Sequence, residues 1–121
     1  MNTIENNLKE GEMLFADGRI DEAAKCFKSI LQSNPQNVNA LNNLGVIYIQ
    51  NKDYKTGVET LLKALENNPE DYDVNMNLQS LINNELVQNE LKDNLNHILN
   101  KKKLKAIERN VASKLAKTVG Y

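Results

Sequence analysis

Several residue types that commonly support binding or stability are scarce in this sequence. Of its 121 residues none is tryptophan, two are phenylalanine, four are tyrosine, two are proline and one is cysteine. The shortage of aromatic side chains argues against a large aromatic cage for a ligand. The single cysteine, Cys26, cannot form an intramolecular disulfide, which fits a reducing compartment.

Long apolar segments are also missing. No apolar run has the length needed to cross a bilayer, and the amino-terminal stretch MNTIENNLKEGE lacks the basic start and apolar centre of a signal peptide. We therefore expect a cytoplasmic protein. A chain of 121 residues suits one domain over residues 1–121, large enough to bury a core without metal or disulfide crosslinks.

Residues for catalysis or metal binding do not cluster along the chain. His97 is the only histidine, with no second histidine and no cysteine near it in sequence. Cys26 has no base close by, so we expect it to act as a small packing residue. The five glycines are dispersed and form no phosphate-binding loop. We expect no enzymatic activity, no metal site, no cofactor and no small-molecule substrate.

Charge is distributed unevenly. Residues 1–99 hold eight Lys or Arg and fifteen Asp or Glu, whereas residues 100–121 hold seven and one. Such a basic tail suggests nucleic acid or an anionic membrane as a partner. No aromatic residue lies among its cations before Tyr121, however, and the acidic body would repel phosphates. We favour a basic capping helix over residues 101–118, with an apolar stripe of Leu104, Ile107, Val111 and Leu115.

A period of 34 residues organises the rest of the chain. It relates Pro35 to Pro69 and Gly11 to Gly45. Each period contains two patterns of helical apolar spacing joined by a short polar turn, and no segment alternates with the period of a strand. The pattern predicts an all-α protein of antiparallel helix pairs, with Asn37 and Asp53 as helix N-caps.

These features resemble the tetratricopeptide repeat, a 34-residue helix-turn-helix unit. Residues 4–37 and 38–71 would be two regular repeats in a right-handed superhelix, an α-solenoid. The second repeat carries the pattern most fully, in Leu44, Gly45, Tyr48, Tyr54, Leu61, Ala64 and Pro69.

Gly45 lies inside a predicted helix, where glycine is less favourable than alanine by about 1 kcal/mol. We expect it to face Gly57 in the partner helix, where two missing side chains let the backbones approach closely. Gly11 and Ala23 would make the same contact one period earlier.

The pattern weakens after residue 71. Gln79 replaces the glycine of the first helix, and Leu91 replaces the small residue of its partner, so residues 72–99 would be a degenerate third pair that is splayed or shifted. Asn83 and Asn84 would make the turn, since asparagine tolerates left-handed backbone geometry. A single long helix through residues 72–99 is the alternative.

The resemblance implies a groove, lined by the first helix of each pair, that binds a peptide or a partner helix. Asn43 and Asn77, 34 residues apart, would form an amide ladder resembling the one in the nuclear and cytoplasmic N-acetylglucosamine transferase. With 20 asparagines in the chain, chance placement is the competing explanation. The predicted groove residues are Leu8, Glu12, Phe15, Asn39, Asn42, Asn43, Val46, Ile49, Met76, Asn77 and Ser80.

We therefore expect a protein-interaction module without catalytic activity. One alternative is a structural protein that forms a homo-oligomer, with the acidic body of one chain against the basic tail of the next. Another is a helper domain of a longer chain, since bacterial relatives of the repeat are often fused to transferases.

Some members of this family grip the acidic carboxy-terminal peptide of the large heat-shock chaperones with a clamp of Lys, Asn and Arg. The matching places here hold Leu8, Glu12, Asn43, Asp73 and Asn77, and two of these would repel a carboxylate. We predict no measurable binding of that peptide in a calorimetric titration. A micromolar dissociation constant would contradict this prediction.

Overall fold

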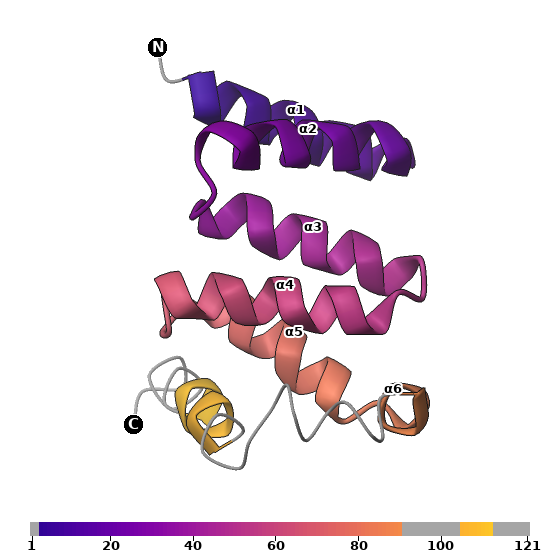
Figure 1. The fold of residues 1–121 in the computed structure, drawn as a ribbon, viewed down its shortest axis with the longest axis vertical. Coiled ribbons are helices and arrows are strands. Elements are labelled where there is room, and N and C mark those ends of the chain that lie inside the picture. Colours follow the sequence, from indigo (N-terminus) through magenta and orange to yellow (C-terminus); the bar gives the residue numbers. More distant parts are fainter. Residues whose placement is uncertain (1–2, 91–104, 113–121) are drawn as a thin grey trace.

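The computed structural model describes residues 3–90 and 105–112, and every regular element in these two ranges is an α-helix (Figure 1). The all-helical prediction is confirmed. Among the described residues no helix combines the length and hydropathy needed to span a bilayer. The helices are α1 (Thr3–Ala16), α2 (Ile20–Ser33), α3 (Val38–Gln50), α4 (Tyr54–Asn67), α5 (Tyr72–Ile82), α6 (Glu85–Glu90) and an unlabelled one over 105–112.

Side-chain caps begin α3, α4 and α5. Asn37 Oδ1 accepts a hydrogen bond from the Ala40 amide at 2.9 Å, and Asp53 Oδ1 accepts one from the Thr56 amide at 3.4 Å. Both caps were predicted from sequence and are confirmed. Asp71, which lies 34 residues after Asn37, caps α5 through the amide of Val74 at 3.0 Å. A cap of this kind is worth about 1 kcal/mol.

The turns within the first two helix pairs also repeat with the 34-residue period. Gly18 has a φ of +80° and Lys52, at the same place one period later, has a φ of +65°. The next amide, that of Arg19 or Asp53, donates to Leu14 O or Tyr48 O at 2.9 Å in each case. The second turn therefore keeps the left-handed geometry although a lysine occupies it.

The helices of the second pair meet where side chains are missing. A Cβ added at Gly45 would lie 2.8 Å from Leu61 Cδ2, and one added at Gly57 would lie 2.8 Å from Ile49 Cγ1 and 3.2 Å from Gly45 O. The predicted close approach of Gly45 and Gly57 is confirmed. In the first pair, the atoms closest to a Cβ on Gly11 belong to the ring of Phe27, at 2.7 Å.

Two apolar clusters form the core, and each draws on more than one helix pair. The first joins α1 and α2 to α3 through residues such as Phe27 and Leu44, and the second joins α3 and α4 to later helices. Leu31, in α2, packs against both clusters. The stack is therefore continuous, because each pair buries apolar surface against the next one.

The third unit contains two helices, as the predicted pair requires. A single helix through residues 72–99 is wrong, because α5 ends at Ile82 and α6 begins at Glu85. Asn83 and Asn84 lie at the turn as predicted. The left-handed geometry expected there is wrong, since Asn83 has right-handed geometry and Lys52 is the only non-glycine residue with positive φ in the described ranges. Asn84 instead caps α6, its Oδ1 accepting from the amides of Leu86 and Val87 at 2.9 and 3.4 Å.

The helix at residues 105–112 packs back onto the second cluster. Ile107 is 2% exposed and belongs to that cluster together with Val87 of α6, and Val111 is also buried. Asn110 Nδ2 donates to Pro69 O at 2.7 Å, which ties this helix to the α4–α5 turn. Leu91, His97, Leu104 and Leu115 lie outside the described residues.

Adding a side chain at Gly45 should push α3 away from α4. Leu61 has no exposed surface and cannot yield to a larger neighbour, so Gly45→Leu should lower the free energy of unfolding by about 3 kcal/mol in urea denaturation. Gln50→Leu, at an exposed position of the same helix, is the control and should change little. Equal stability of the two variants would contradict the packing described here.

Replacing Lys52, which has left-handed backbone geometry, with glycine should stabilise the folded chain. A left-handed conformation costs a residue with a Cβ about 1–2 kcal/mol. Glycine avoids this cost, but it also makes the unfolded chain more flexible, which cancels part of the gain in stability. Lys52→Gly should therefore raise the free energy of unfolding by about 0.5–1 kcal/mol, measured by urea denaturation. Asn51→Gly, where φ is −81°, should give no gain. A gain in stability in both variants would show that the positive φ of Lys52 is not the cause.

Candidate peptide-binding face

The first helices of the three pairs lie next to one another. α3 contacts both α1 and α5, while α2 and α4 pack between successive pairs. We call the surface that these three helices share the α1–α3–α5 face. It is the surface on which the family resemblance places a ligand groove.

A small pocket opens on this face between α1 and α3. It has a volume of about 90 Å³ and is lined by Glu12, Phe15, Asn43 and Val46, with Phe27 of α2 as a fifth wall. The structure thus brings together four predicted groove residues. Nothing in the sequence marks Phe27, a side chain of α2, as reaching this pocket.

Asn42 and Asn77 join α3 to α5 across the same face. Asn77 Nδ2 donates to Asn42 Oδ1 at 2.9 Å, and both side chains are partly buried. The bond links residues 35 positions apart, whereas the expected ladder placed Asn77 in series with Asn43. Asn42 Nδ2 and Asn77 Oδ1 enter no further hydrogen bond within the described ranges, so the pair still offers donors and an acceptor.

Two predicted groove residues are packed inside the helix pairs instead. Leu8 is 9% exposed and belongs to the first core cluster. Ile49 packs against the second cluster and lies over Gly57. Of the remaining predicted residues, Asn39 and Ser80 are exposed and Met76 is partly buried.

Charged side chains around the face are mostly acidic. Glu5, Glu12 and Asp73 are exposed, and Lys9 is the one Lys or Arg in helices α1, α3 and α5. Like charges repel across a shared surface. The α1–α3–α5 face therefore favours ligands that are neutral or basic over acidic ones.

Cys26 lacks the environment of a reactive thiol. Burial raises the pKa of the Cys26 thiol, and the carboxylates of Glu10 and Glu22 raise it further. A raised pKa leaves less thiolate at neutral pH, and the thiolate is the nucleophile. Across residues 3–90 and 105–112, no three His, Cys, Asp or Glu side chains are grouped closely enough to hold a metal ion.

Comparisons with known proteins agree with this architecture. A family model described as "Tetratricopeptide repeat" matches residues 14–81. "Peroxisome biogenesis protein 5" of Arabidopsis thaliana is 32% identical over 81 residues, which cover 67% of this chain and 11% of that protein. This chain therefore spans about a tenth of the length of that relative.

A solved structure shares the fold. That of "MamA RS-1 ArsTM double mutant" superposes with a TM-score of 0.67 at 17% sequence identity. The match covers 93% of this chain and 58% of the other. At this level of identity the likeness concerns the path of the backbone and not the ligand.

Proposed function

The chain belongs to the tetratricopeptide repeat family, and we propose that it is a protein-interaction module without catalytic activity that binds an extended peptide along its α1–α3–α5 face. The observation that carries this proposal is the pocket formed by Glu12, Phe15, Asn43 and Val46 beside the Asn42–Asn77 pair. It combines an apolar recess with amides on one open surface.

The two parts of the face suit different parts of a peptide. The recess has room for a short apolar side chain, and burying one contributes about 1.5–3 kcal/mol. The amides of Asn42, Asn43 and Asn77 can both donate and accept, so they can pair with peptide groups of any sequence. Such a face would select a peptide by one apolar residue and hold the rest through its backbone.

Charge narrows the class of peptide further. Glu12 lines the recess itself, and Glu5 and Asp73 lie on the same helices. A basic residue next to the apolar anchor would meet a carboxylate at the edge of the recess. We therefore propose a ligand with an apolar anchor, at least one adjacent Lys or Arg, and few acidic residues.

A random 12-residue peptide library displayed on phage would test the proposal. Selection on the full chain should enrich peptides with an apolar residue next to a basic one. The double variant Asn43→Ala, Asn77→Ala should bind a synthetic copy of an enriched peptide at least about ten-fold more weakly, since each lost hydrogen bond costs about 1 kcal/mol. Fluorescence anisotropy would measure the affinity.

The matched control is the double variant Asn67→Ala, Asn89→Ala. Both asparagines are exposed, and they lie on α4 and α6, outside the α1–α3–α5 face. This variant should bind as the wild type does. Equal affinities for all three proteins would discard the face as the binding site.

A further inference from the structure

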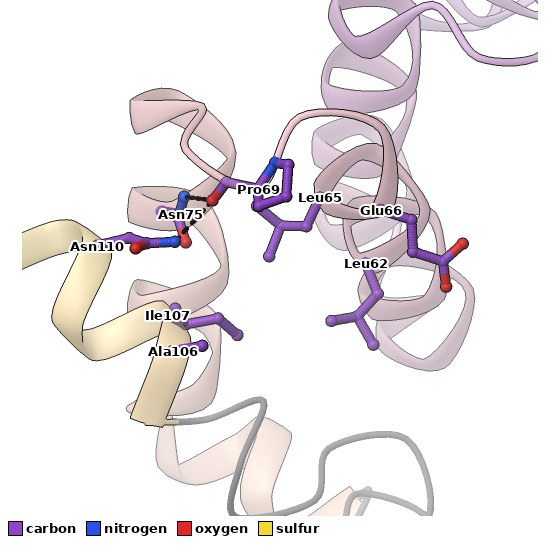
Figure 2. Close-up of a pocket in the computed structure, with 8 residues that line it drawn as sticks. All are labelled: Leu62, Leu65, Glu66, Pro69, Asn75, Ala106, Ile107 and Asn110. Atoms are coloured by element: carbon purple, nitrogen blue, oxygen red, sulfur yellow. Dashed lines mark hydrogen bonds between the residues drawn. The ribbon is translucent and has the colours of Figure 1, made fainter.

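A second and larger pocket lies at the other end of the helix stack. It has a volume of about 190 Å³ and opens between α4, the α4–α5 turn and the helix at residues 105–112 (Figure 2). Leu62 and Leu65 face it from one side and Ala106 and Ile107 from the other, with Pro69 at the turn. None of its lining residues belongs to the pocket on the α1–α3–α5 face.

Asn75 makes one wall of this second pocket and is 1% exposed. Its Nδ2 donates to Pro69 O at 3.0 Å and to Asp71 O at 2.7 Å. Those two carbonyls fix the orientation of the amide, because a flipped Oδ1 would face acceptors. The Oδ1 is then left buried without a hydrogen-bond partner in the described part of the chain, which costs about 1–3 kcal/mol.

The repeat explains why the space exists. Asn75 occupies the place held by Leu41 one period earlier, and Leu41 is 3% exposed within the second core cluster. Asparagine presents an amide where leucine would present two methyl groups to this cluster. The third unit therefore has a polar atom and an unfilled apolar recess where the second unit has packed core.

We propose that this pocket binds a small phenolic molecule whose ring lies against the apolar walls and whose hydroxyl donates to Asn75 Oδ1. An apolar cavity of roughly 150 Å³ accommodates benzene, so one substituted ring fits the space. Among the described lining residues Glu66 is the one that carries a charge, and it disfavours an anionic ligand. A buried acceptor without a partner, beside an apolar recess, matches a ring with one donor.

Asn110 lies beside the buried acceptor. Its Nδ2 shares Pro69 O with Asn75, and Figure 2 shows the two amides together at one end of the pocket. Asn110 is partly exposed, whereas Asn75 Oδ1 is shielded from water. The proposal requires the Asn110 side chain to rotate outward so that a hydroxyl can reach that oxygen, and the Asn110 side-chain amide should therefore report binding directly.

An NMR titration of the full chain with p-cresol and with toluene tests this site. Both rings should shift the backbone amides of Leu65 and Ile107. Both should also shift the side-chain amides of Asn75 and Asn110 through their ring currents, but p-cresol should shift them further, and it should bind about five-fold more tightly because of its one additional hydrogen bond. The amides of Asn43 and Val46 should not move with either ring, which separates this site from the peptide-binding face.

A substitution in the wall of the pocket gives a second test of the proposal. Ala106→Leu should fill part of the pocket and weaken binding of both rings at least ten-fold. Ala112→Leu, at an exposed position of the same helix that does not line the pocket, should leave both affinities unchanged. Equal affinity for toluene and p-cresol, or saturable shifts confined to residues outside the pocket, would overturn the proposal.

Discussion

The close approach of α3 and α4 at Gly45 and Gly57 is the contact on which the remaining structure depends. Without two Cβ atoms the backbones come within reach of Leu61 and Ile49, so the pair buries its apolar faces fully. Glycine weakens each helix by about 1 kcal/mol. The packing between α3 and α4 offsets that loss.

The two ends of the helix stack differ. At the amino-terminal end, α1 and α3 leave a small recess that Glu12 makes acidic. At the other end, Asn75 stands where a leucine stands one period earlier, and a helix from the end of the chain closes a larger apolar pocket. A repeat whose members were identical would have neither difference. Specific binding would therefore arise at the positions where one repeat differs from the next.

Much of the fold could be predicted from the 34-residue period, because capping, turns and apolar spacing are local properties. The caps at Asn37 and Asp53 and the contact between Gly45 and Gly57 follow from that reasoning. The left-handed lysine at position 52 does not, since lysine carries no signal for this geometry. Only the neighbouring repeat, with Gly18 at the same place, points to it.

The candidate site was less predictable than the fold. Pairing Asn77 with Asn42, and turning Leu8 and Ile49 inward, depends on small rotations and offsets between helices. Sequence spacing places a residue on a stripe of the helix but leaves the edges of that stripe undecided. For the same reason, no feature of the sequence indicated that Phe27 would reach the pocket beside Asn43.

The central claim, that backbone proximity at two glycines sets the geometry of the repeat, can be measured directly by NMR. The structure predicts strong nuclear Overhauser contacts from the Gly45 Hα protons to the Leu61 methyl groups and from the Gly57 Hα protons to the Ile49 side chain. Their absence in a chain whose α3 and α4 amides are helical would contradict the account.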